Sequence, residues 1–169
     1  MGRRAGHEVL RKIAMKAAHT RLFGYMEIED EKIIHFDNGI IGFPHLKDFT
    51  LINDAEEKVN ESSINWLQSL DEPDLALPVM DPLVIEPNYD PVVEDEFLEP
   101  LGEMTPESTF VLVTVTVPQN IEEIAVNLKA PIIVNLTTNR AGQLIVENDY
   151  PVRYKIYDLL KENDERAGE

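Results

Sequence analysis

Short apolar segments separated by turn residues dominate the pattern of hydrophobic and polar positions along the chain. The clearest strand is predicted at 109–117, where β-branched residues are dense and valine alternates with leucine or threonine from Val111 onward. Two apolar segments at 131–136 and 143–147 predict a hairpin across 139–142. Shorter strands are predicted at 25–28, 32–36, 49–52 and 64–68.

Helical signals are few. Residues 153–163 are predicted to be helical, with Ile156, Leu159 and Leu160 on one face, and an acidic segment at 94–101 fits a short helix. Many short strands with frequent Gly and Pro turns predict a mainly β fold, either a barrel or a sandwich. Closing the sheet removes exposed strand edges, so we expect a small antiparallel β-barrel-like single domain with one or two short helices.

The 169 residues fit one domain of ordinary size. Residues 1–19 are predicted to be a basic N-terminal extension outside the core, 20–163 the β domain and 164–169 a charged tail. Apolar residues between 9 and 17 fall near helical spacing, which fits a short amphipathic helix, and Met15 is an alternative start.

The charge is strongly and unevenly acidic. The chain holds 15 basic and 32 acidic residues, a net charge of −17. Residues 1–21 hold six of the basic residues and one acidic residue, so the remaining 148 residues hold 9 basic and 31 acidic residues, a charge of −22. Such a body repels nucleic-acid phosphates and attracts basic proteins. We therefore expect no direct nucleic-acid binding, although acidity that serves only solubility is an equal alternative.

Several classes of chemistry lack the residues they need. The absence of cysteine excludes disulfides, thiolate metal sites and a cysteine nucleophile. The four histidines (His7, His19, His35 and His45) show no metal-binding spacing. No phosphate-binding glycine loop or GxSxG motif occurs, and no apolar run approaches a membrane span. We predict no cofactor, metal or catalytic residue, no membrane association, and a cytoplasmic location.

The stretch 65–82 combines the only tryptophan, Trp66, with four carboxylates, and it has two interpretations. Paired carboxylates beside an aromatic platform are the residues of a glycoside hydrolase. Acidic residues next to proline more commonly cap turns by accepting backbone N–H bonds, and three of the four flank prolines. Turn capping is the favoured interpretation. The four carboxylates are Asp71, Glu72, Asp74 and Asp81.

Two acidic segments combine carboxylates with apolar side chains, at 86–97 and at 121–124. Apolar anchors surrounded by carboxylates suit a basic amphipathic helix as a partner. A solvated acidic loop whose aromatic side chains turn inward is the competing interpretation. The candidate partner-binding residues are Tyr89, Asp90, Glu94, Glu96, Ile121, Glu122 and Glu123.

The order and spacing of several short motifs resemble the FliW family of flagellar assembly factors. They include Phe23-Gly24, the loop 39–44, the stretch 66–71, Leu77-Pro78-Val79 and the segment 126–135, and together they cover about residues 20–155. The N-terminal extension and the acidic tail depart from the family pattern. The signature residues, which we expect to be structural, are Gly39, Gly42, Phe43, Trp66, Gln68, Asp71, Asn127, Pro131 and Asn135.

The resemblance implies a non-enzymatic regulator with a small β-barrel-like fold. Family members bind flagellin, protecting it before export as a chaperone does, and also bind the RNA-binding translational repressor CsrA. The two engagements are linked, so flagellin level is coupled to flagellin synthesis. A carboxylate-dependent hydrolase and a small-ligand-binding β-barrel are the alternatives from other classes. The surface that meets each partner and the oligomeric state are not predicted.

Overall fold

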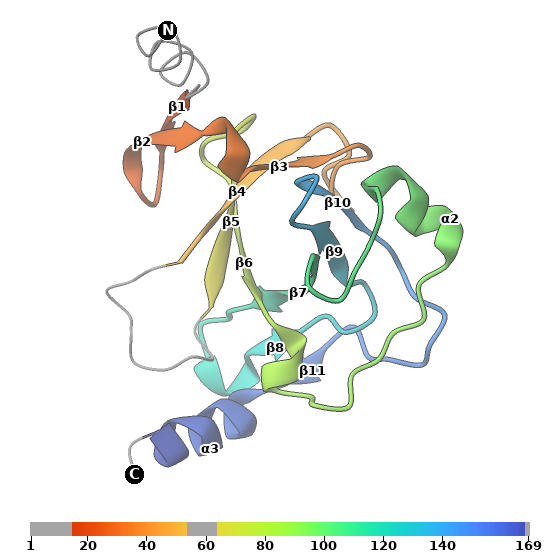
Figure 1. Cartoon of the computed structure of the whole chain (residues 1–169). Coiled ribbons are helices and arrows are strands. Elements are labelled where there is room, and N and C mark those ends of the chain that lie inside the picture. Colours follow the sequence, from red (N-terminus) through yellow and green to blue (C-terminus); the bar gives the residue numbers. More distant parts are fainter. Residues whose placement is uncertain (1–14, 54–63, 168–169) are drawn as a thin grey trace, which may run out of the picture.

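The computed structural model describes residues 15–53 and 64–167. Its centre is a closed β-barrel of seven strands, in which β7 pairs with both β6 and β9 and so completes the ring (Figure 1). All neighbouring barrel strands are antiparallel except β10 and β3, which are parallel. The expected mainly β, barrel-like fold is therefore confirmed. The barrel strands are β3 (Ile33–Phe36), β4 (Asp48–Ile52), β5 (Asn65–Ser69), β6 (Ala76–Met80), β7 (Thr109–Thr116), β9 (Ile132–Asn135) and β10 (Arg140–Gln143).

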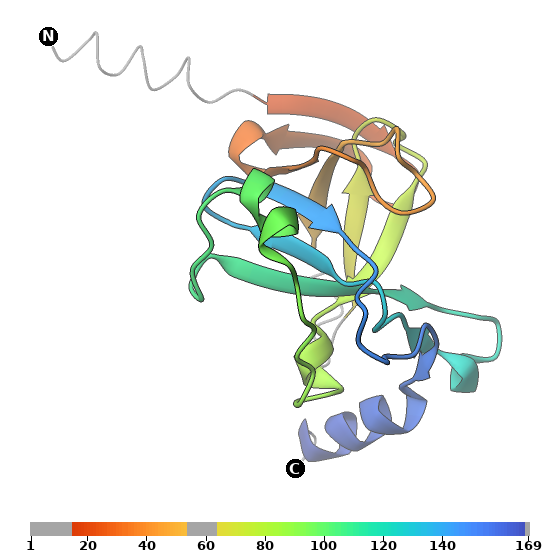
Figure 2. The same cartoon turned by 90° about the vertical axis from the view of Figure 1, so that its right-hand side faces the viewer.

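Additional elements cover the two ends of the barrel (Figure 2). A hairpin of β1 (Met15–Thr20) and β2 (Gly24–Glu29) lies at one end. At the other end, β8 (Ala125–Val126) and β11 (Tyr154–Lys155) extend from β7 and lead into α3 (Tyr157–Ala167). The short helices are η1 (Asp30–Lys32), η2 (Pro82–Val84), α2 (Asp95–Leu98), η3 (Glu99–Leu101) and η4 (Ile121–Glu123).

Strand β7 is buried on both faces, which explains its nearly continuous apolar sequence. Leu112 packs in the barrel interior, where Phe36 and Phe49 meet edge to face with ring centroids 5.2 Å apart. Val113 and Val115 face a second apolar cluster outside the barrel. That second cluster combines Ile85 and Tyr89 of the connection between β6 and β7 with residues of the segments 124–128 and 154–160, so one strand supports both cores.

The predicted hairpin is wrong in its second strand. The structure pairs β9 with Arg140–Gln143, and the turn between them is 136–139. Asn139 provides the left-handed position of that turn, with φ 57°. The apolar residues at 144–146 instead run beside 129–131, since Leu144 N–H donates to Pro131 and Val146 N–H donates to Lys129.

The N-terminal boundary also differs from expectation. The segment predicted as an extension ends at residue 19, but Met15–Thr20 is strand β1, and Ala18 is buried against Ile28 and Leu70. The amphipathic helix expected between residues 9 and 17 is therefore wrong for residues 15–17, because these residues pair with β2. The rest of that expected helix lies outside the described residues. The C-terminal helix begins at Tyr157 rather than 153, because Tyr154 and Lys155 pair with β8. The charged tail expected at 164–169 begins within this helix.

Candidate functional site

Two of the four carboxylates in the stretch 65–82 accept hydrogen bonds from backbone N–H groups, Asp71 from residues at the start of β4 and Asp81 as the cap of η2. Asp71 Oδ2 accepts hydrogen bonds from the backbone N–H groups of Lys47 and Asp48, at 2.8 and 3.0 Å. Partial burial alone would raise the pKa of Asp71, but these two hydrogen bonds hold it below its usual value. Asp81 Oδ1 accepts from Leu83 N–H at 2.9 Å and caps η2. Both carboxylates are engaged with backbone amides rather than with each other.

The glycine-rich loop at 39–44 is a tight backbone turn. Gly39 has φ 66°, and a Cβ at this position would lie 2.5 Å from the carbonyl oxygen of Phe43. Phe43 N–H donates to Ile40 at 2.7 Å, and the Phe43 ring packs against the barrel core. Gly42 also has a positive φ, 92°, but space for a side chain. These residues shape the scaffold.

Two polar signature residues, Gln68 and Asn127, form hydrogen bonds with the backbone of the residues that follow them in the chain. Gln68 is fully buried, and its Nε2 lies 2.9 Å from the carbonyl oxygens of Ser69 and Pro73. Asn127 Oδ1 accepts from the N–H groups of Lys129 and Ala130, at 3.0 and 3.2 Å, just before the buried Pro131. Trp66, by contrast, is half-buried on β5 and meets Phe23 edge to face, with ring centroids 6.5 Å apart.

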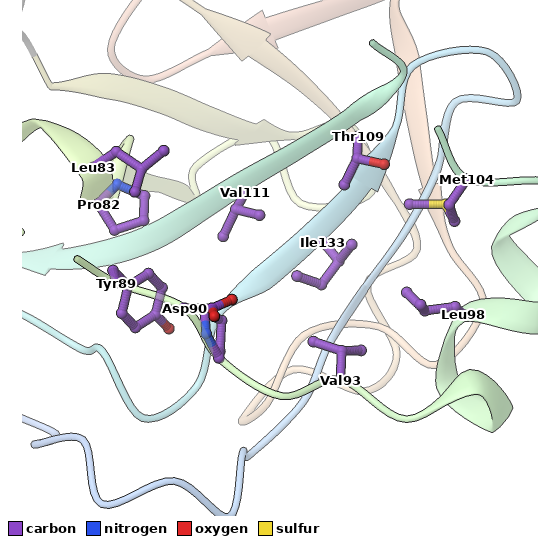
Figure 3. Close-up of a pocket in the computed structure, with 11 residues that line it drawn as sticks. Pro82, Leu83, Tyr89, Asp90, Val93, Leu98, Met104, Thr109, Val111 and Ile133 are labelled. Atoms are coloured by element: carbon purple, nitrogen blue, oxygen red, sulfur yellow. The ribbon is translucent and has the colours of Figure 1, made fainter. Parts of the chain in front are cut away.

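An apolar pocket of about 280 Å³ lies on the outer face of the barrel. Its floor is the cross-strand pair Val111 of β7 and Ile133 of β9, and the connection 81–108 forms its walls (Figure 3). Val93 and Leu98 point into the space from the wall, and Leu83 is half exposed at its edge. The remaining lining residues are Pro82, Tyr89, Asp90, Pro91, Met104 and Thr109.

The connection 81–108, called the wall of the pocket below, is attached to the barrel near one end by Tyr89, which is buried and lines the pocket. Its hydroxyl donates to the carbonyl oxygen of Leu128 at 2.7 Å, and its ring lies 4.7 Å from the ring of Tyr150. Burial, with a smaller contribution from Tyr150, raises the pKa of Tyr89 far above its usual value, so the hydroxyl keeps its proton. Asp90 N–H donates to the Tyr150 hydroxyl at 3.0 Å, which fixes the backbone beside the pocket.

The other end of the wall is anchored by Asn135, which is fully buried at the end of β9. Asn135 Nδ2 donates to the carbonyl oxygens of Leu101 and Glu103, at 2.9 and 3.1 Å. Phe97 of α2 packs directly on Gly142, where an added Cβ would lie 2.8 Å from Phe97 Cζ. Both ends of the connection are therefore attached to the barrel on either side of Val111 and Ile133.

The segment around the pocket carries negative charge only. Residues 82–108 contain eight acidic residues and no lysine or arginine. Seven of the eight side chains are exposed, and Asp90 itself lines the pocket. An apolar cavity with an acidic border can accept an apolar group from a positively charged partner. The eight are Glu86, Asp90, Glu94, Asp95, Glu96, Glu99, Glu103 and Glu107.

The structure separates the predicted partner-binding residues into two groups. Tyr89 and Asp90 line the pocket, and Glu94 and Glu96 are exposed on the same connection. The residues at 121–123 form η4, which follows the far end of β7, and do not line the pocket.

Within η4, Ile121 and Glu122 are exposed, whereas Glu123 forms a 2.9 Å ion pair with Lys155. The hydrogen bond and charge of Lys155 lower the pKa of Glu123. The floor residues of the pocket were missed from the sequence, because Val111 and Ile133 resemble any other buried strand residue.

Among the described residues, no group of three His, Asp or Glu side chains is placed to hold a metal ion. The same part of the chain contains no helix long and apolar enough to cross a membrane. Apolar side chains such as Phe36, Phe49 and Leu112 pack in the barrel interior. The pocket lies outside the barrel and so differs from the internal cavity of a ligand-carrying barrel.

Comparison with known proteins gives one consistent result. Residues 17–156 match the family described as FliW protein. The flagellar assembly factor FliW of Lachnospira eligens is 50% identical over 147 residues, which cover 86% of this chain and 97% of that protein. The FliW of Thermotoga neapolitana is 42% identical over 151 residues, covering 88% and 96%. A crystal structure of the flagellar assembly factor FliW aligns with a TM-score of 0.76 at 27% identity, covering 84% of this chain and 97% of that one.

Proposed function

The chain belongs to the FliW family of flagellar assembly factors, and from this premise we propose that it is a non-enzymatic regulator that binds flagellin and the translational repressor CsrA. Flagellin binding would protect the export substrate before assembly, and CsrA binding would relieve repression of flagellin mRNA. Linking the two couples flagellin synthesis to flagellin level in the cytoplasm.

The observation that carries this proposal is the acidic connection 82–108 around an apolar pocket. An RNA-binding protein must present positive charge to the phosphate backbone. An acidic surface attracts such a protein, and once bound it opposes the approach of RNA to the same region. The proposal therefore explains antagonism of CsrA by charge, without any chemical step.

Titration calorimetry with purified CsrA and purified flagellin, separately and in competition, tests the proposal. We expect both to bind, and we expect saturation with one partner to change the apparent affinity for the other. Absence of binding to either protein at low salt would refute the proposed function.

A second measurement tests the charge mechanism. The affinity of CsrA for its mRNA target should fall when this protein is added, and the effect should diminish as salt screens the acidic surface. An unchanged CsrA–RNA affinity at low salt would refute antagonism while leaving binding itself intact.

A further inference from the structure

We propose that Asn38, together with Gly39, is a site of spontaneous covalent modification at which the asparagine is converted to isoaspartate, and that the turn after β3 restrains this conversion. The reaction therefore takes place when the turn opens. It needs water but no partner protein, so its test is independent of the proposed function.

The chemistry uses only the two residues and water. The backbone nitrogen of Gly39, after losing its proton, attacks the side-chain carbonyl carbon of Asn38. The new N–C bond closes a five-membered succinimide ring, and the side-chain amide leaves as ammonia. Water then adds to one of the two ring carbonyl carbons and breaks its bond to nitrogen, which gives aspartate or isoaspartate. In isoaspartate the main chain runs through the former side-chain carbonyl, so the backbone is one methylene group longer.

Both the sequence and the side-chain contacts single out Asn38. It is the only asparagine in the chain that precedes a glycine. Glycine has no Cβ to shield its backbone nitrogen, so ring closure meets little steric resistance at this pair. Asn38 is exposed, and its side chain forms no hydrogen bond with any of the described residues. Other asparagines are held in place, because the Oδ1 atoms of Asn120, Asn127 and Asn148 accept backbone N–H groups.

The turn of residues 36–39 restrains the attacking nitrogen. Gly39 N–H donates to the carbonyl oxygen of Phe36 at 3.1 Å, which is the hydrogen bond that closes a β-turn. Lys47 Nζ donates to the carbonyl oxygen of Asp37 at 2.6 Å, so the residue before Asn38 is also held. Attack on the side chain requires the Gly39 nitrogen to turn away from Phe36. The net contribution of one such hydrogen bond corresponds to about a 2- to 10-fold lower population of the open turn.

The structure around Gly39 has no space for a longer backbone. Gly39 is buried with φ 66°, and a Cβ at this position would lie 2.5 and 2.6 Å from the carbonyl oxygens of Phe43 and Pro44. Phe43 N–H donates to Ile40, and the Phe43 ring packs against the barrel core. An additional methylene group directly before Gly39 therefore displaces the loop 39–44. We expect the isoaspartate form to unfold at a lower urea concentration than the unmodified protein.

Incubation of the full chain in mildly alkaline buffer, followed by peptide mapping with mass spectrometry, tests the site. We expect isoaspartate and aspartate to accumulate at position 38 before any other asparagine changes. The rate in the folded protein should be about 2- to 10-fold lower than in the same chain unfolded in guanidinium chloride. Asn38→Gln is the matched control, because its longer side chain cannot close the five-membered ring, and it should show no modification at this position.

Two further comparisons test the restraint and the structural consequence. Lys47→Met removes the donor to Asp37 and keeps an apolar side chain of similar length, so modification at position 38 should be about 2-fold faster or more. Lys161→Met changes an exposed lysine of α3 and should leave the rate unchanged. Freshly purified Asn38→Asp carries the new carboxylate without the additional methylene group, and its urea midpoint should exceed that of the isoaspartate form.

Each step has its own refuting result. An intact Asn38 in the folded protein, after the unfolded chain has been fully converted, would overturn the site, and so would earlier modification at another asparagine. Equal rates in the folded and unfolded chains would overturn the restraint by the turn, as would equal rates in Lys47→Met and wild type. If Lys47→Met does not fold, the comparison of folded and unfolded wild type decides. Equal urea midpoints of the isoaspartate form and Asn38→Asp would overturn the displacement of the loop.

Discussion

Replacing Asn135 tests whether the wall of the pocket depends on one buried amide. The side chain donates to the carbonyl oxygens of Leu101 and Glu103 and accepts from the N–H groups of Thr137 and Thr138, at 2.9 and 3.4 Å. Asn135→Ala removes all four contacts. It therefore weakens the attachment of both the end of the connection 81–108 and the turn between β9 and β10.

The expected loss of stability depends on which hydrogen bonds the partners of Asn135 keep in the variant. Leu101 O still accepts from the Thr138 hydroxyl at 2.7 Å, so it does not become unsatisfied. Glu103 and Thr137 are exposed, and water can replace part of their lost bonding. With about 0.5–1.5 kcal/mol for each lost hydrogen bond, Asn135→Ala should lower the free energy of unfolding by about 3 kcal/mol. That corresponds to a fall in Tm of about 6–12 °C for a chain of this size.

Urea denaturation monitored by tryptophan fluorescence measures the effect, with Asn120→Ala as the control. Asn120 caps η4 by accepting from Glu122 N–H at 3.2 Å on the exposed surface, and its loss should cost only about 1 kcal/mol. Asn135→Asp should be worse than Asn135→Ala at neutral pH, because its carboxylate would face two carbonyl oxygens. A loss below about 1 kcal/mol in Asn135→Ala would refute the assigned role.

Three further substitutions test other parts of the scaffold. Asp71→Ala should lower stability by about 0.5–2 kcal/mol. The pKa of Asp71 in the folded protein lies below its ordinary value of 3.8, so the stabilisation is fully present above pH 3.8 and is lost as pH falls through the folded pKa. The urea midpoints of the variant and the wild type should therefore converge in acid. Gly39→Ala should cost about 2 kcal/mol or more in thermal unfolding, because it combines a left-handed backbone with a clash against Phe43; a neutral result would contradict the turn geometry. Tyr89→Phe should cost about 1–2 kcal/mol by removing the buried hydrogen bond to Leu128, and equal urea midpoints would contradict that bond.

The strands that could be predicted from the sequence are those whose own residues favour extended structure. Thr109–Thr116 is dense in β-branched residues, and the predicted strand at 109–117 agrees with β7. Strand β10 was misplaced because Arg140-Ala141-Gly142-Gln143 has little intrinsic preference for a strand. It is extended because β9 and β3 pair with it from both sides, and such long-range pairing leaves no local sequence signal.

Strand β6 was missed for a related reason. Pro78 argues against a central strand, because proline cannot donate to a sheet ladder. In the structure β6 pairs with β5 through 76–79 but with β7 only from Val79 onward. Pro78 therefore lies where β6 has a neighbour on one side only. Sequence alone cannot reveal that β5 and β7 pair with different parts of β6, because this offset arises from the closure of the barrel.

The contacts of the segment 86–97 show which of its side chains turn inward, whereas partner binding by this segment stays a prediction. Tyr89 turns inward to reach Leu128, whereas Asp90 lines the pocket and Glu94 stays exposed. The buried Tyr89 holds this acidic segment in place, and the segment faces Val111 of β7 and Ile133 of β9, two strands that are far apart in the sequence. Composition could thus identify an acidic segment, but not the cavity it encloses.

Stability and partner binding are therefore expected to be coupled through the same wall. Asn135 lines no part of the pocket, yet it fixes Leu101 and Glu103, which flank the wall residues Leu98 and Met104. A wall freed at this end must be ordered again on binding, which reduces affinity without removing any direct contact. In Asn135→Ala, CsrA affinity should fall even at temperatures where the variant is fully folded. An unchanged affinity would mean that Tyr89 and Phe97 alone keep the pocket open.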